Sequence, residues 1–335
     1  MAKVITLGEM LLRLSTETGQ RLRKAYNLEV NYGGAEVNVA IALSLYGHDT
    51  RFVTRLPNNL LTDGMLNYLE SYKVDTSYIC FGGERIGSYF VEVGAGNRSS
   101  KVVYDRKYSS VSEWDKSEID FSEFLKGQDV LHISGITPAI SKAAAELTVE
   151  LVKEAKSHGL FVSFDCNFRE KLWTIEDARK TFKRILPYVD ICSCGELDLK
   201  YIFNYDVDAK LSDALQLANL YEQLLDDFPN IVALYSTKRN QISSSHNTLI
   251  GYYYINNTLY MSNEVNMDHI IDRVGGGDAF SSSVLHGYLS KWEAQNIVEF
   301  ATTAAALKHT IKGDANLVTE NEVMDLMANG TKISR

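Results

Sequence analysis

Near its carboxyl end the chain carries the run Asp272-Arg273-Val274-Gly275-Gly276-Gly277-Asp278-Ala279-Phe280, which leads into a segment with helical character, Asp278–Leu289. Glycines let backbone amides approach a ligand closely, and the first turn of a helix offers unpaired N–H groups and a positive dipole. This combination is suited to binding phosphate. An aspartate in that first turn could accept a proton from a hydroxyl group that attacks the phosphate.

A second interpretation of the same run is a flexible loop in which Asp278 caps the helix, because aspartate is a preferred N-cap residue. On the glycines alone the two interpretations carry similar weight. The run is not a Walker A loop, because no Gly-Lys-Ser/Thr follows it. It is not a dinucleotide fingerprint either, because it lies late in the chain and lacks the G-x-G-x-x-G spacing.

Short apolar segments alternate with longer amphipathic ones along the whole chain. The expected strands are Val4–Gly8, Val130–Ser134, Phe161–Asp165, Ile191–Ser193 and Ile231–Ser236. The expected helices are Glu36–Tyr46, a segment from Pro138 to about His158, Glu176–Leu186, Glu196–Phe203, Ser212–Asp227, Asp278–Leu289 and Glu293–Ile311. This alternation predicts right-handed βαβ units and an α/β sandwich of three layers, with a mostly parallel central sheet covered on both faces.

Two stretches, about 10–32 and 78–110, interrupt this alternation with strand-like patterns. They flank the helix that begins after Gly33-Gly34, and we expect them to pair into a small separate sheet. Such a sheet is a natural lid for a pocket at the carboxyl ends of parallel strands. With four prolines and no break in composition, residues 1–335 are predicted to form a single domain that carries this lid.

Composition excludes several classes of protein. The 335 residues carry a net charge of −9 and no basic run, which argues against binding to nucleic acid or to anionic membranes. No apolar stretch reaches the 18 residues of a membrane span, and the first residues lead directly into a strand, so a cytoplasmic protein is predicted. The four cysteines lack zinc-ligand spacing and are expected to be free thiols.

The chain resembles the ribokinase-like (PfkB) carbohydrate kinases over nearly its whole length. The resemblance rests on Gly33-Gly34-Ala35-Glu36-Val37-Asn38-Val39-Ala40 and on the 272–280 run, which occur in the family's order. It implies an ATP-dependent kinase in which Gly275, Gly276 and Gly277 form an anion hole for the transferring phosphoryl group. It also implies that Asp278 deprotonates the acceptor hydroxyl.

Arginines at predicted pocket positions bear on the substrate, because the planar guanidinium group can bind a carboxylate through two hydrogen bonds. The chain looks most like the 2-keto-3-deoxygluconate kinases of the family. Their substrate contacts would fall on Tyr89, Tyr104, Arg106 and Arg169, with Gly34 and Asn38 at the sugar hydroxyls. Ribokinases hold sugar with an aspartate after the first strand, where this chain has Arg13. Gluconate or galactonate stereochemistry stays open.

On the nucleotide side the resemblance implies ATP with Mg²⁺, and the chain departs from the family pattern there. The family's Asn-x-x-Glu motif reads Ser193-Cys194-Gly195-Glu196, so Glu196 is the candidate metal residue, acting through water. Other candidate nucleotide contacts are Ser193, Thr237, Arg239, Gly277 and Lys308. Ordinary helix packing is the alternative explanation for Lys308.

Two other functions remain open at this point: a neutral-sugar kinase such as a fructokinase on the same fold, and a non-catalytic sugar-binding regulator. The retained Asp278 speaks against the regulator. An open-edged lid sheet invites pairing with a second copy, so a homodimer through the lid is expected.

Overall fold

The computed structural model describes residues 1–208 and 210–330. Its strands are β1 (Lys3–Leu7), β2 (Leu11–Ser15), β3 (Glu29–Gly33), β4 (Asp49–Val53), β5 (Arg55–Leu56), β6 (Cys80–Phe81), β7 (Ser88–Glu92), β8 (Lys101–Asp105), β9 (Val130–Ser134), β10 (Phe161–Asp165), β11 (Ile191–Ser193), β12 (Ala233–Gln241), β13 (Asn247–Ile255), β14 (Thr258–Met261) and β15 (Val265–Met267). Its α-helices are α1 (Ala35–Leu45), α2 (Leu60–Ser71), α3 (Phe121–Leu125), α4 (Ile136–Ala139), α5 (Lys142–Ser157), α6 (Ile175–Ile185), α7 (Glu196–Tyr201), α8 (Asp213–Asp227), α9 (Gly276–Leu289), α10 (Ala294–Lys308) and α11 (Glu320–Asn329). Short 3₁₀ turns lie at Leu22–Lys24, Lys116–Glu118 and Leu186–Tyr188.

A large mixed sheet forms the centre of the molecule, in the order β14-β13-β12-β11-β10-β9-β1-β4, with β15 paired to β13. Strands β4, β1, β9, β10, β11 and β12 are parallel, and β13 runs antiparallel to β12. The carboxyl ends of the parallel strands therefore meet at one edge of the sheet. Ligands of open α/β sheets bind at this edge.

Helices cover both faces of this sheet and complete the three layers. One apolar core contains buried side chains of α5, α6 and α8, and a second contains those of α1, α9, α10 and α11. A third cluster places α2 against α1 and β4. Strands buried on both sides by helices carry nearly continuous apolar runs, as in β9, where all five residues are buried.

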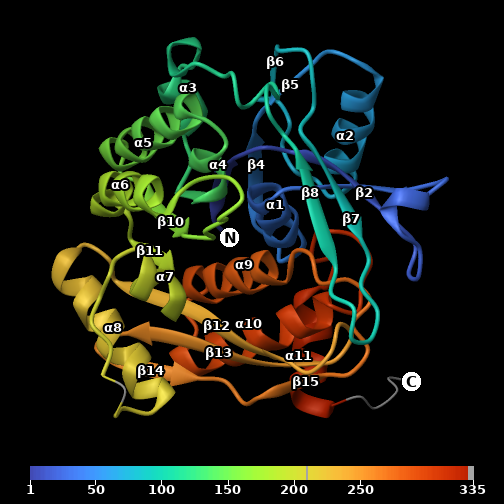
Figure 1. Cartoon of the computed structure of the whole chain (residues 1–335). Helices are drawn as coiled ribbons and strands as arrows, with labels where there is room; N and C mark the ends of the chain where they lie inside the picture. The colour runs from blue at the N-terminus through green and yellow to red at the C-terminus, as the bar shows by residue number, and fades with distance from the viewer. Residues whose placement is uncertain (209, 331–335) are drawn as a thin grey trace.

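The predicted lid is present as a separate four-stranded sheet in the order β3-β2-β7-β8. Figure 1 shows β2, β7 and β8 side by side, apart from the large sheet. One face carries Arg13 and Tyr89, which are directly paired across β2 and β7, and Tyr104 on β8. The side chains alternate between the two faces of a sheet, so these three residues share one face.

The strand expected at Ile231–Ser236 is longer than its pattern indicated. β12 continues to Gln241, and the serine-rich stretch after it forms the turn of a hairpin with β13. Polar residues after Ser236 suggested a loop, but they lie beyond β11 and are exposed, so they need no apolar character. Strand β4, helix α2 and the antiparallel edge β13–β15 were not predicted from the sequence. No helix in the described ranges is long and apolar enough to cross a membrane.

Candidate functional site

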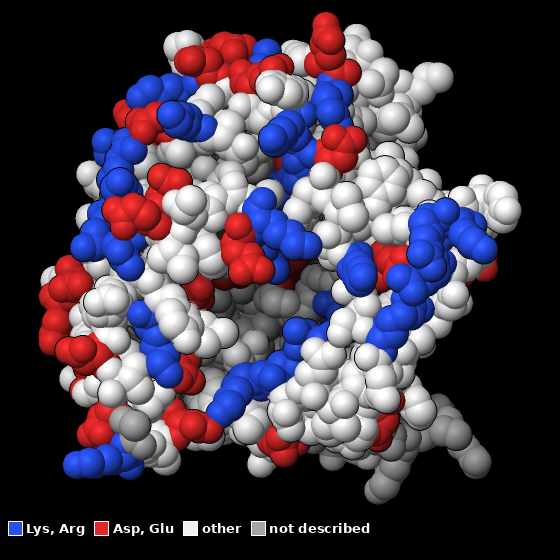
Figure 2. Space-filling view, viewed as in Figure 1, with Lys and Arg blue, Asp and Glu red and all other residues white. Residues whose placement is uncertain are grey.

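A cleft of about 990 Å³ lies between the carboxyl edge of the large sheet and the lid sheet. Figure 2 shows this face of the molecule hollowed near its centre, with Lys and Arg side chains along part of the rim. Thirteen of the fifteen residues predicted from the sequence line this cleft: Gly34, Asn38, Tyr89, Tyr104, Arg106, Arg169, Ser193, Thr237, Arg239, Gly275, Gly276, Gly277 and Asp278. Glu196 and Lys308 do not.

The three glycines form the turn that starts α9. Gly275 has a φ of 81°, in the left-handed region, and a Cβ there would stand 1.7 Å from the carbonyl oxygen of Asp314. Only glycine fits this position. A Cβ on Gly277 would have nothing within 4 Å, so the start of α9 faces open space in the cleft. A helix start with free space in front of it can accept an anion.

Asp278 lies in the first turn of α9, and the Asn38 Nδ2 of α1 donates a hydrogen bond of 2.7 Å to its Oδ2. The pKa of Asp278 is raised to about 7, mainly by burial; the charges of Asp165 and Glu36 also raise it, while the hydrogen bond from Asn38 and the charge of Arg169 lower it. A carboxyl group with a pKa near neutrality is suited to accept a proton. The other amide atom of Asn38, Oδ1, is buried and has no partner in the described part of the chain, so it remains available to a ligand hydroxyl.

Arg106 and Tyr104 lie together in the lid wall of the cleft. The guanidinium of Arg106 lies 5.9 Å from the centre of the Tyr104 ring, and its Nε donates a 2.7 Å hydrogen bond to Glu9 Oε2. Both members of this ion pair are buried. Glu9 holds the guanidinium at its Nε, so the two terminal nitrogens remain for a ligand.

Tyr89 and Arg13 contact acidic residues. The Tyr89 hydroxyl donates to Asp314 Oδ2, and Arg13 contacts Asp314 at 3.1 Å and Asp272 at 2.5 Å. The desolvation of Arg13 opposes its charge, but Asp314 and Asp272 more than compensate and raise its pKa. Arg13 therefore faces the cleft with its charge already balanced, and it connects the lid to the glycine turn.

Arg169 follows β10 and is exposed in the cleft. It makes no ion pair among the described residues, although its charge lowers the pKa of Asp165 and of Asp278. Burial is the larger effect on Asp165 and raises its pKa to about 6. Arg169 thus has no ion-pair partner among the described residues, and it lies close enough to Asp278, the candidate base, to lower its pKa.

The residues predicted to contact the nucleotide, Ser193, Thr237 and Arg239, also line the cleft. Ser193 ends β11, and Thr237 and Arg239 lie on the part of β12 that extends beyond it. Arg273, in the glycine run, was not singled out in the sequence, and its guanidinium donates to Gln241 Oε1 at 3.2 Å. Arg239 and Arg273 are close enough for Arg273 to lower the pKa of Arg239, after the larger effect of desolvation. Two adjacent arginines without an ion-pair partner in the described chain are typical of a site for a polyanion.

Glu196 and Lys308 lie outside the cleft wall. Glu196 starts α7, and its Oε1 accepts hydrogen bonds from Lys200 Nζ at 2.9 Å and Gln216 Nε2 at 2.6 Å. Lys308 is fully buried at the end of α10, and its ammonium donates to the backbone carbonyls of Ile311 and Gly313. These positions give no support to a direct nucleotide contact by Lys308.

Two important acidic residues were not singled out from the sequence. Glu36, in the Gly-Gly-Ala motif, is buried, and its Oε1 accepts hydrogen bonds from the amide and hydroxyl of Ser134 and the hydroxyl of Thr137. It fastens α1 to the end of β9. Asp314, behind the glycine turn, forms an ion pair with Arg13 and accepts a hydrogen bond from the Tyr89 hydroxyl. Glu36 stands inside the quoted 33–40 motif and Asp314 lies outside both quoted motifs, and for each only the distant partners reveal the role.

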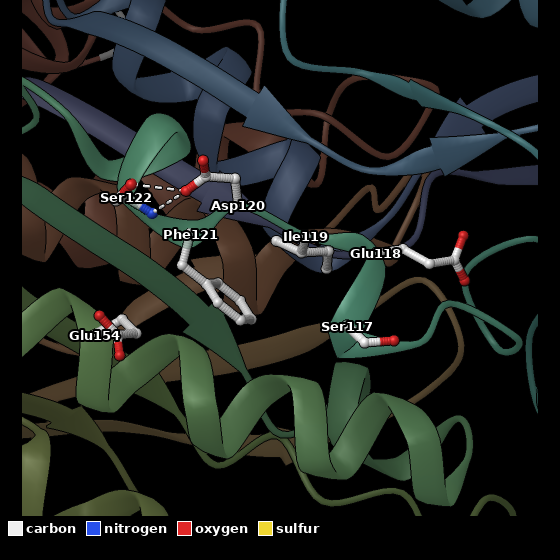
Figure 3. A pocket seen from close by; sticks show the side chains of 7 residues that line it. All are labelled: Ser117, Glu118, Ile119, Asp120, Phe121, Ser122 and Glu154. Carbon is white, nitrogen blue, oxygen red and sulfur yellow. Dashed lines mark hydrogen bonds between the residues drawn. The ribbon is translucent and has the colours of Figure 1, made fainter.

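A shallow hollow lies elsewhere, between the 3₁₀ turn at Lys116–Glu118, α3 and α5 (Figure 3). Its Asp120 accepts hydrogen bonds from the amide nitrogen of Ser122 at 3.1 Å and its hydroxyl at 2.7 Å, as the N-cap of α3. The other polar side chains there have partners as well, for example Glu118 with Arg55 at 3.0 Å, and none of the predicted site residues lies there.

The chain is similar to known carbohydrate kinases in sequence and in fold. The sequence profile named "pfkB family carbohydrate kinase" matches residues 1–321. A 2-dehydro-3-deoxygalactonokinase of Haloferax volcanii is 29% identical over 98% of both chains. A 2-dehydro-3-deoxygluconokinase structure from Thermotoga maritima is 38% identical, with a TM-score of 0.94 over 98% of this chain and 100% of that one. A PfkB family carbohydrate kinase structure from Listeria grayi is 41% identical, with a TM-score of 0.92 and the same coverage.

Proposed function

Because this chain belongs to the pfkB family of carbohydrate kinases, we propose that it transfers the γ-phosphoryl group of ATP to the 6-hydroxyl of 2-keto-3-deoxygluconate. The observation that carries the proposal is the common cleft of Asp278, the glycine turn, Arg106 and Arg169. The first two suit phosphoryl transfer and the arginines suit a carboxylated sugar. Relatives named as kinases of such sugar acids support the same substrate class.

In the proposed reaction the sugar carboxylate binds to Arg106 and Arg169, and Asn38 Oδ1 accepts a hydrogen bond from a sugar hydroxyl. Asp278 takes the proton of the 6-hydroxyl as its oxygen bonds to the γ-phosphorus. The bond from that phosphorus to the bridging oxygen of ADP breaks at the same time. The amides of Gly275–Gly277 stabilise the charge on the transferring group.

The nucleotide side of the cleft suits a polyphosphate. Arg239 and Arg273 are the proposed contacts to its phosphates, with Ser193 and Thr237 beside them. The described residues contain no group of three or more His, Cys, Asp or Glu side chains arranged around one metal position. We propose that Mg²⁺ is held mainly by phosphate and water and that it neutralises phosphate charge when bound. Glu196 stays proposed only as a contact through water.

Turnover of different sugars tests the proposal. With ATP and Mg²⁺, we expect kcat/KM for 2-keto-3-deoxygluconate or its galactonate epimer to exceed that for fructose or ribose by about a hundred-fold or more, because a neutral sugar offers no carboxylate to Arg169 or to the terminal nitrogens of Arg106. ADP release measures this directly. Higher turnover of fructose would favour the neutral-sugar kinase, and sugar binding without any ADP release would favour the non-catalytic regulator.

We also propose that the protein is cytoplasmic, that it folds as one domain, and that it dimerises through the lid. The lid face opposite Arg13 carries an apolar row of directly paired residues, one from each strand: Val30, Leu14, Phe90 and Val103. Val30 and Val103 are each 54% exposed, so the row is open for a second copy of the same surface.

A charged residue in this row tests the dimer. Val103→Glu is expected to convert a dimer to a monomer in sedimentation equilibrium, because two copies of the charge would face a desolvated apolar surface. The exposed Leu215→Glu on α8 is the matched control and should leave the mass unchanged. A wild-type chain that is monomeric at all concentrations would rule out the lid dimer.

A further inference from the structure

Lys308 is a lysine that the proposed reaction does not use, although it lies close to the reacting groups. Its side chain is fully buried, with a relative exposure of 0%. Its ammonium donates to the carbonyl oxygens of Ile311 at 3.2 Å and Gly313 at 2.7 Å. Burying an ammonium group is costly. Its two hydrogen bonds go to neutral carbonyl groups and no ion pair is formed with any residue that the structure describes, so the presence of a buried charge at this place needs an explanation.

The turn that Lys308 holds lies directly behind the glycine turn. The Asp314 carbonyl occupies the space beside Gly275, and the Lys308 Cε is 3.3 Å from the place of a Gly275 Cβ. The Gly313 amide donates to Asp272 Oδ2 at 3.1 Å, and Asp272 Oδ1 accepts from the Val274 amide at 3.1 Å. Asp272 therefore accepts from the amide of Gly313 and Lys308 donates to its carbonyl oxygen, so both polar backbone groups of this residue are held next to the proposed anion hole.

The charges behind the glycine turn balance. Arg13 and Lys308 carry two positive charges, and Asp272 and Asp314 carry two negative ones. Burial lowers the pKa of Lys308, but the carboxylates of Asp272, Asp314 and Asp278 oppose this effect. Without the ammonium the group would have a net negative charge beside the position of the transferring phosphoryl group, which is itself negative.

We infer that Lys308 is a positioning residue whose ammonium takes the place of a bound monovalent cation behind the anion hole. It holds the 311–314 turn against Gly275 and neutralises the acidic side chains there. Carbonyl and carboxylate oxygens are the ligands that small hard cations prefer, and here a side chain of the protein supplies the cation. This inference rests on the proposed phosphoryl transfer.

The first test uses the wild-type protein. Its kcat is expected to change by less than about twofold when potassium chloride is replaced by tetramethylammonium chloride at equal ionic strength, because the cation is built in. Activation by potassium or ammonium of about tenfold or more would overturn the inference, since an outside cation would then be required. A wild type without any phosphoryl transfer would instead contradict the proposed function.

The second test replaces the charge. Lys308→Met is expected to lower kcat by about 10–100-fold with little change in the KM of the sugar, because the anion hole loses its support. Ammonium chloride should restore part of the lost kcat, tetramethylammonium chloride should not, and Lys308→Gln should behave like Lys308→Met. Lys180→Met, an exposed lysine on α6, is the control.

Thermal unfolding shows whether each variant is folded. A folded Lys308→Met with wild-type kcat, or with the same loss in every salt, would overturn the inference. If both variants fail to fold, the cation dependence of the wild type decides alone.

Discussion

Asp278→Asn is expected to lower kcat by about a thousand-fold or more while sugar binding changes little, because removing a positioned base costs 10²–10⁴ in rate, on the order of what general-base catalysis contributes. The asparagine can still accept the hydrogen bond that Asn38 now donates to Asp278, so the local structure should persist. Rapid-quench measurement of sugar phosphate and calorimetric sugar binding test the two parts.

The pH profile adds an independent check on the same residue. The raised pKa of Asp278, about 7, means that its active, deprotonated form is lost as the pH falls through neutrality. Wild-type kcat should therefore rise with pH through about 7, and the residual rate of Asp278→Asn should lack this step. Asp325→Asn, on the exposed face of α11, is the control. Near-normal turnover in Asp278→Asn would remove Asp278 from its assigned role.

Arg169→Ala is expected to lower kcat/KM for the sugar acid by about 10–150-fold, because hydrogen bonds to charged groups contribute about 1.5–3 kcal/mol. The loss for a neutral sugar should be much smaller. Arg169 is the cleaner of the two substrate arginines for this experiment. Arg106→Ala would also leave the buried carboxylate of Glu9 without its partner, so its effect would mix binding with stability.

Arg169 also lowers the pKa of Asp278, so the comparison should be made well above pH 7, where Asp278 is deprotonated in both proteins. Arg23→Ala, an exposed arginine outside the cleft, is the matched control. An equal loss for the sugar acid and for fructose would show that Arg169 acts on catalysis in general. The carboxylate assignment would then fail, while the kinase assignment would stand.

Features that depend on neighbours in sequence could be predicted. β9, β10 and β11 were predicted with the bounds they have in the structure, because each is a short apolar run between clear boundaries. The turn at Gly275 could be expected because glycine alone tolerates a left-handed backbone there. The β12–β13 hairpin was missed because its exposed outer half carries no apolar pattern.

The sequence by itself determined the α/β alternation, the glycine turn and the position of Asp278 in the first turn of the helix, since local backbone preferences and residue spacing are enough for these. Only the tertiary structure decided what each charge contacts. Arg13 pairs with Asp272, 259 positions away in sequence, and the Cε of Lys308 lies 3.3 Å from the place of a Gly275 Cβ. The partner of a buried charge is set by which distant segments the fold brings together, because desolvation makes an unpaired charge costly. Local sequence patterns therefore do not predict which residues pair with a buried charge.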